Sequence, residues 1–194
     1  MKQRSEDVTP FSFDLSTLVG RSVASLYSHL VTRPTGRALR LGIESQIGEL
    51  GARCLSVLDF TQVVVLDYSC ADEAVAKLIQ RYQGSDGVTD VYFVARGLGE
   101  HHRDPIEEVL RRHRLAMVGE VAARRFALLG EVSTLERAVW DALERARLGG
   151  AAELAAVVDL PSTVVADALH ALAKRRVVLR REAGYHALSA LVAH

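Results

Sequence analysis

The clearest pattern in the chain is an almost unbroken apolar run over residues 55–60. It predicts a strand that is covered on both faces, because a half-exposed strand alternates apolar and polar positions. A helix is predicted to follow, with Asp72 and Glu73 in its first turn, where the helix dipole favours negative charge. A second apolar run, at 63–66, is too short and too close to the strand to form an element of its own. The loop before the helix carries three polar or reactive groups, Asp67, Ser69 and Cys70.

Strand and helix patterns alternate up to about Val132. Strands are predicted at residues 11–18, 23–31, 55–60, 91–94, 115–121 and 126–129. One helix is expected to start with Thr35 as its cap, and another to have Pro105 in its first turn. Helices that follow central strands imply right-handed crossovers and a mixed, partly parallel sheet covered by helices. The first part of the chain is therefore expected to be an α/β domain.

From about Ser133 the pattern changes to helices followed by a hairpin. The predicted elements are helices from Ser133 or Thr134 to Gly149–Gly150, over 152–158 and over 162–174, then strands at 177–179 and 185–188. Ser162 is expected to cap the third of these helices. Helix, helix-turn-helix and hairpin in this order is the winged-helix arrangement. We therefore expect two domains, at residues 10–130 and 133–194.

Composition narrows the functional classes. The chain has 194 residues, 49% hydrophobic and 25% charged, and its formal net charge is zero. A neutral chain has no overall field that steers it to nucleic acid or to an anionic membrane. Its charged N-terminal segment lacks a signal-peptide pattern, and no run reaches the roughly 18 apolar residues of a membrane span. The two cysteines, Cys54 and Cys70, have neither metal-ligand nor disulfide spacing. These features predict a cytoplasmic protein.

Three segments of the first domain carry a family resemblance. They are RPTGRALRLGIE at 33–44, LSVLDFTQVVVLDYSCADEA at 55–74 and VYFVARGL at 91–98. With them, residues 10–121 resemble STAS domains, the fold of bacterial anti-sigma-factor antagonists, and especially the divergent STAS-like branch. That family carries a phosphorylatable Ser or Thr at the start of the helix after the central strand, usually with an Asp before it. The resemblance implies that Asp67 and Ser69 form a phosphorylation switch.

Two interpretations of Ser69 stay open at the level of sequence. Tyr68 and Cys70 replace the small residue and the glycine that flank the hydroxyl in the family. A phosphate on Ser69 would meet the free N–H groups of a helix start, but nearby carboxylates would repel it and release a partner. Alternatively, Ser69 only caps the helix. The carboxylates are also expected to raise the pKa of Cys70 and suppress its thiolate. The expected partner surface comprises Tyr68, Cys70, Asp72 and Glu73.

The second domain resembles the winged helix-turn-helix domains of transcription regulators. The likeness rests on LERAVWDAL, DLPSTVVADALHALAKRRVV and LRREAGYHAL, which lie between residues 135 and 188. In such domains the second helix of the motif enters the major groove and the hairpin meets the DNA backbone. The residues expected to contact DNA are Ser162, Thr163, His170, Lys174, Arg175, Arg176, Arg180 and Arg181. Against DNA binding, Asp167 would face phosphates, and the arginines could instead pair with Glu182 in a solvated hairpin.

Other residues offer no chemistry by pattern. His101 and His102 are expected in a solvated loop rather than at a metal, because adjacent histidines point in different directions. No phosphate-binding loop and no catalytic set is recognisable, so neither an enzyme nor a cofactor is predicted. Trp140 suits core packing.

Two hypotheses about function follow. The first is a bacterial transcription regulator in which a STAS-like sensing or interaction domain controls a DNA-binding winged helix, with homodimerisation expected from half-site recognition. The second is a protein-interaction module without DNA contact, of the anti-sigma-factor-antagonist type.

Overall fold

The computed structural model describes residues 20–26, 28–50, 53–83 and 90–192, and the strand predicted at 11–18 lies outside them. The described residues form an α/β fold around a five-stranded sheet of order β1-β3-β5-β6-β7. Its strands are β1 (Gly20–Ser25), β3 (Arg53–Asp59), β5 (Asp90–Arg96), β6 (Ala116–Ala122) and β7 (Arg125–Gly130). All neighbours are parallel except β6 and β7. The predicted mixed sheet is confirmed.

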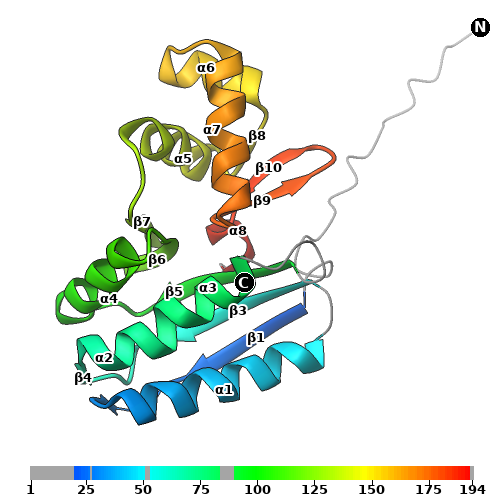
Figure 1. Ribbon diagram of the computed structural model, residues 1–194. Helices are drawn as coiled ribbons and strands as arrows, with labels where there is room; N and C mark the ends of the chain where they lie inside the picture. Colours follow the sequence, from blue (N-terminus) through cyan, green and yellow to red (C-terminus); the bar gives the residue numbers. More distant parts are fainter. Residues whose placement is uncertain (1–19, 27, 51–52, 84–89, 193–194) are drawn as a thin grey trace, which may run out of the picture.

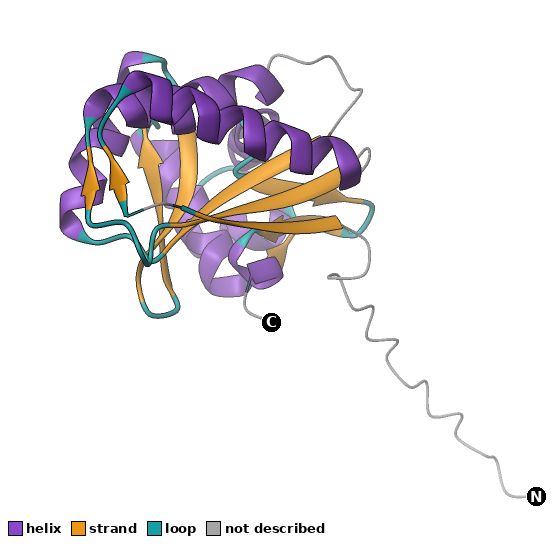
Figure 2. Cartoon of the chain, turned by 90° about the horizontal axis from the view of Figure 1, so that it is seen from below, coloured by secondary structure: helices purple, strands orange, loops and turns teal. Residues whose placement is uncertain are grey.

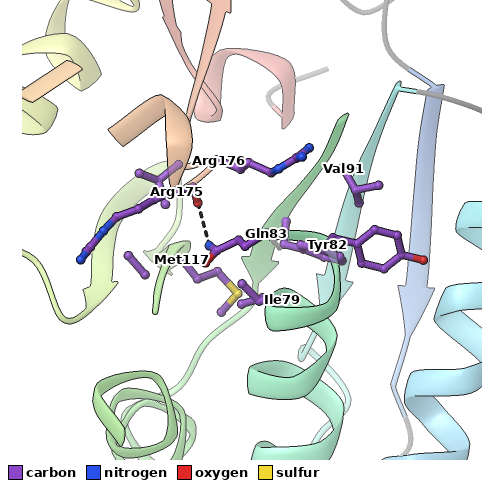
Figure 3. Close-up of a pocket in the computed structure, with 10 residues that line it drawn as sticks. Ile79, Tyr82, Gln83, Val91, Met117, Arg175 and Arg176 are labelled. Atoms are coloured by element: carbon purple, nitrogen blue, oxygen red, sulfur yellow. Dashed lines mark hydrogen bonds between the residues drawn. The ribbon is translucent and has the colours of Figure 1, made fainter. Parts of the chain in front are cut away.

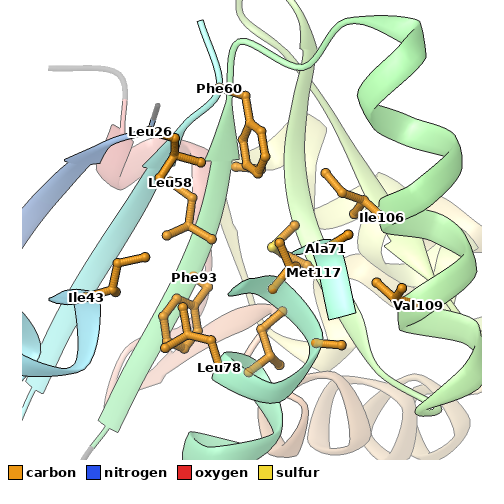
Figure 4. Close-up of a cluster of buried hydrophobic side chains, with 14 of the residues drawn as sticks. Leu26, Ile43, Leu58, Phe60, Ala71, Leu78, Phe93, Ile106, Val109 and Met117 are labelled. Carbon is orange, nitrogen blue, oxygen red and sulfur yellow. The ribbon is translucent and has the colours of Figure 1, made fainter. Parts of the chain in front are cut away.

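Three helices lie along one face of this sheet (Figures 1 and 2). They are α1 (Arg33–Leu50), α4 (Glu100–Arg112) and a composite helix made of α2 (Tyr68–Ala71), the π-helical turn η2 (Asp72–Ala76) and α3 (Lys77–Gln83). Their apolar sides share a core with sheet residues such as Leu58, Phe93 and Met117 (Figure 4). The described strands follow one another in order across the sheet, so they lack the reversal at which α/β proteins open a ligand crevice.

The C-terminal segment covers the opposite face of the sheet (Figure 1). A second hydrophobic cluster joins sheet residues Val57, Val94 and Leu128 to Trp140 and Leu172 of the C-terminal helices. Strand β3 is therefore buried on both faces, as residues 55–60 predict: Leu58 faces the α1 side and Val57 faces the C-terminal segment. Because one core contains side chains from both parts of the chain, the C-terminal segment is packed on the sheet.

The C-terminal segment runs helix, strand, helix, helix, hairpin. Its elements are α5 (Thr134–Ala146), β8 (Leu148–Gly149), α6 (Ala151–Val158), α7 (Ser162–Lys174), β9 (Val178–Arg181), β10 (Gly184–Ala187) and α8 (Ser189–Val192). Strand β10 lies between β8 and β9 and is antiparallel to both. Ser133 caps α5 as predicted, because its hydroxyl accepts the Glu136 N–H at 3.1 Å while the Glu136 carboxylate accepts the Ser133 N–H at 2.8 Å.

Several predicted boundaries are wrong. Helix α1 begins at Arg33, and Thr32 rather than Thr35 accepts a backbone N–H at its start. Helix α4 begins at Glu100, so Pro105 lies inside it. Pro161 occupies the cap position of α7, and Ser162 is its first helical residue. Before α4, Gly99 already has the extended backbone of a cap, so the helix starts directly after it.

Two further predictions about strands need correction. The single strand expected at 23–31 is divided into β1 and the short strand β2 (His29–Leu30). Residues 63–66 contribute an element after all, because β4 (Val65–Leu66) pairs with β2 in parallel. Backbone hydrogen bonds to this remote partner, which a local pattern does not reveal, make so short a strand stable.

Candidate functional site

The predicted switch lies at the start of α2. Asp67 is the cap of this helix: its Oδ1 accepts the Cys70 N–H at 2.7 Å and the Ser69 hydroxyl at 2.9 Å. Ser69 therefore donates to the cap, and the interpretation of Ser69 as the cap itself is wrong. A phosphate on Ser69 would replace this donor with negative charge beside the Asp67 carboxylate and would weaken the capped helix start.

The four residues expected to form a partner surface are divided between surface and interior. Tyr68 is 54% exposed, whereas Cys70, Asp72 and Glu73 are buried. The helix begins at Tyr68 and not at Asp72, which moves the two carboxylates one turn further along and toward the neighbouring helices. Burial, with Asp67 and Glu73 nearby, raises the pKa of the Cys70 thiol to about 11. Cys70 is thus a protonated core residue at neutral pH, as expected.

Asp72 and Glu73 form the centre of an ion cluster. Arg33 donates to Asp72 at 2.9 Å and to Glu73 at 3.0 Å, and His113 Nε2 lies 2.7 Å from Asp72 Oδ1. Lys77 is bonded to Glu73 as well. The cluster joins the start of α1 and the end of α4 to η2, and it brings the RPTGR and SCADE motifs together. Arg33 and His113 lie about 40 residues from these carboxylates in the chain, so a local pattern does not reveal the pairing.

Gly36 explains why α1 comes so close to this cluster. A Cβ atom at this position would lie 2.8 Å from the Cys70 carbonyl oxygen and 2.9 Å from Glu73 Cβ. Any side chain would therefore push α1 away from α2 and η2. The π-helical turn lies at the same contact, and such turns are frequent at functional sites.

Acid is expected to destabilise the protein through the ion cluster. Burial acts to raise the pKa of Asp72, but hydrogen bonds from His113 and Arg33 outweigh it and hold this pKa below its usual value. The hydrogen bond from Lys77 likewise lowers the pKa of Glu73. Both carboxylates stabilise the fold above their unfolded pKa values of about 4. This contribution is lost as the pH falls through the lower folded values.

Urea unfolding at a series of pH values measures this effect. The midpoint should be nearly constant above about pH 5 and fall below about pH 4. In the double variant Asp72→Asn, Glu73→Gln the midpoint should be lower at neutral pH, and its difference from the wild type should shrink in acid. If the midpoints of the wild type and the double variant differ equally at all pH values, protonation of these two carboxylates does not cause the loss of stability in acid.

Aliphatic side chains surround the start of α2 on the outside of the protein. Val31, Val64, Val65 and Tyr68 are 43%, 62%, 41% and 54% exposed, and we call them the Tyr68 surface. The pairing of β2 with β4 and the 2.9 Å hydrogen bond from the Asp67 N–H to the Leu30 carbonyl bring these residues to adjacent strands and the helix start. Only Val63 and Leu66 of the 63–66 run are buried. The polar start of α2 is thus bordered by exposed apolar side chains.

The residues predicted to contact DNA separate into two groups. Exposed on α7 and on the hairpin are Ser162, Thr163, His170, Lys174 and Arg180. Arg175 and Arg176 turn toward the rest of the chain: Arg175 donates to the Glu131 carbonyl oxygen, and Arg176 lies 3.3 Å from Asp90. Two guanidinium nitrogens of Arg181 are also buried. Among the described residues, Arg175 and Arg176 therefore do not pair with Glu182, the partner that one interpretation of the sequence predicts; their partners are Glu131 and Asp90.

The end of α7 is joined to the end of α3. Gln83 Nε2 donates to the Arg175 carbonyl oxygen at 2.8 Å (Figure 3). The hollow beside this bond has a volume of about 10 Å³. That is room for one water molecule at most, so it holds no ligand.

The two adjacent histidines lie in α4 rather than in a loop, so that prediction is wrong. His102 is buried: its Nδ1 accepts the Gly99 N–H at 3.1 Å and its Nε2 donates to the Val63 carbonyl at 2.8 Å. Burial lowers the pKa of His102, which is consistent with this neutral tautomer. Another histidine, His29, shares a 3.0 Å hydrogen bond with the Ser28 hydroxyl, but the two residues are adjacent in the chain and exposed. In the described part of the chain no carboxylate orients His29, and no three His, Cys, Asp or Glu residues form a metal site.

Comparison with known proteins adds no assignment: no protein-family model matches this chain, and no curated protein matches it significantly. Across the residues that the structure describes, no single helix has the length and apolar character needed to cross a membrane. Helices α6 and α7 reach that length and apolar character only when taken together, and their axes are bent by 111° at the break between them.

Proposed function

We propose that the chain is a non-catalytic regulatory protein that works through protein–protein contacts. Its first part would be a STAS-like domain whose partner binds the Tyr68 surface, and its second part a winged helix-turn-helix domain. The observation that carries the proposal is the exposed apolar Tyr68 surface beside the Asp67–Ser69 hydrogen bond. Supporting the domain assignment are the consecutive parallel strands with helices on one face, and the helix–strand–helix–helix–hairpin order that follows.

In this proposal Ser69 controls the partner. The hydroxyl is half-buried and bonded to Asp67, so negative charge at Ser69 would be placed against a carboxylate at the edge of the Tyr68 surface. Such repulsion would displace a partner that packs on Tyr68. The kinase that phosphorylates Ser69 and the partner would be cytoplasmic proteins. The chain itself is expected to form a homodimer.

Affinity capture with the intact protein tests this function. We expect one stoichiometric partner that forms a purified complex with the wild type and is lost with the double variant Val64→Ser, Tyr68→Ala or with Ser69→Glu. The matched control is Leu41→Ser, because Leu41 is also 50% exposed but lies on α1. A stable complex that survives the Val64 and Tyr68 changes would refute the proposed site.

Transcription regulation through direct DNA contact is the second candidate function. The observation in its favour is the exposure of Lys174 and Arg180 at the end of α7 and on the hairpin. Against it, the inward contacts of Arg175 and Arg176 leave few cations for phosphates, which supply most of the affinity of DNA-binding proteins. Protein contact is therefore the function that the geometry favours.

A further inference from the structure

Helix α6 lies at the end of the molecule furthest from the five-stranded sheet (Figure 1). Val157 is 60% exposed, and Leu160, in the turn before α7, is 36% exposed. Ala152 and Ala156 are exposed too, and their four-residue spacing places them on one side of α6. The two large apolar side chains at this end of α6, Val157 and Leu160, are thus exposed next to small exposed alanines.

The same region is purely acidic. Residues 148–173 contain no lysine or arginine, and they include Glu153, Asp159 and Asp167. All three carboxylates are exposed. Glu153 accepts the Gly150 N–H at 2.9 Å. Within the part of the chain that the structure describes, the carboxylates of Asp159 and Asp167 have no hydrogen bond or ion pair.

Asp159 occupies a position at which it is locally unfavourable. It ends α6 with a left-handed backbone, φ 54°, a conformation that glycine adopts most easily. It also places a negative charge at the carbonyl end of the helix, where the dipole is already negative. Glycine would relieve both effects. A cationic group bound at this point would instead be attracted by the carboxylate and by the helix end together.

We propose that α6 and the α6–α7 turn bind a basic amphipathic helix of a partner protein. Its apolar side would pack on Val157 and Leu160, and its lysines or arginines would pair with Asp159 and Glu153. This inference rests on the proposed protein-interaction function and adds a second surface with a defined partner chemistry. The acidic rim disfavours nucleic acid and anionic membranes at this face, since it repels DNA phosphates and anionic lipids alike.

A model peptide tests the proposal. The intact ¹⁵N-labelled protein is titrated with a synthetic helix of about 15 leucines and lysines, with the leucines on one face. A second peptide carries glutamate in place of every lysine. We expect the basic peptide to shift amide signals of residues 152–163, and the acidic peptide to shift none. The double variant Val157→Ser, Asp159→Asn should weaken binding by about tenfold, equivalent to 1.4 kcal/mol. The control, Val64→Ser, should bind as the wild type does.

Other outcomes overturn the inference. These are the absence of binding, equal binding of the acidic peptide, signal changes confined to other surfaces, or an unchanged affinity in the Val157 and Asp159 variant. Duplex DNA that shifts the same amides would also overturn it. Failure here leaves the Tyr68 surface untouched, because the capture experiment depends on Val64 and Tyr68 and not on α6.

Discussion

The substitution Val57→Asp is expected to unfold the sheet and the C-terminal segment together. Val57 is fully buried between them, in the cluster that also contains Trp140. An unpaired carboxylate at such a site costs several kcal/mol. That is a large part of the roughly 5–15 kcal/mol by which a folded protein is stable.

The position of the single tryptophan makes this result measurable. Trp140 lies in α5, so its fluorescence reports on the C-terminal segment, whereas far-ultraviolet circular dichroism reports on the whole chain. In the Val57→Asp variant, the unfolding midpoints measured by the two signals should move to lower denaturant concentration by the same amount. The control is Val23→Asp: Val23 pairs in register with Val57 on the same side of the sheet, but it is 43% exposed. It should cost no more than about 1 kcal/mol. An unchanged Trp140 transition in Val57→Asp would show that the two parts fold independently.

The substitution Gly36→Ala should destabilise the protein, whereas the same change six residues later in α1 should stabilise it. The added methyl group at residue 36 collides with the Cys70 carbonyl and Glu73, and overpacking of this kind costs about 1–3 kcal/mol. Gly42 has no atom within 4 Å of such a methyl group. There, alanine gains about 1 kcal/mol through its higher helix propensity.

Urea unfolding of the two variants decides whether close packing of α1 on α2 and η2 maintains the ion cluster. The midpoints should move in opposite directions from the wild type. If Gly36→Ala is as stable as the wild type or more stable, the close approach of α1 to Cys70 is not needed for stability.

The strands of the sheet could be predicted from sequence because their apolar runs are local signals. Residues 55–60, 91–94, 115–121 and 126–129 correspond to β3, β5, β6 and β7. The packing of the C-terminal segment on the sheet could not be derived in the same way. A strand buried on both faces requires a cover, but the pattern does not say which part of the chain provides it.

Side-chain partners explain most of the errors at the candidate site. Asp72 and Glu73 look like the first turn of a helix, yet their carboxylates are hydrogen-bonded to Arg33 and, for Asp72, to His113, each about 40 residues away. Asp67 was the local signal for the true helix start, since it lies three residues before the N–H that it caps. The exposure of Val64 and Val65 could not be predicted, because an apolar run such as 63–66 is also typical of a buried strand.

The central claim is that this protein acts through protein contacts and not through DNA, and retention of duplex DNA by the intact protein tests it most directly. A mixture of genomic fragments is titrated at low salt and again at about 150 mM salt, with the double variant Lys174→Glu, Arg180→Glu as a comparison. We predict no retention at the higher salt, and at low salt no difference between the wild type and the variant. Retention that persists at the higher salt and is abolished in the variant would contradict the account and establish α7 and the hairpin as a DNA-binding surface.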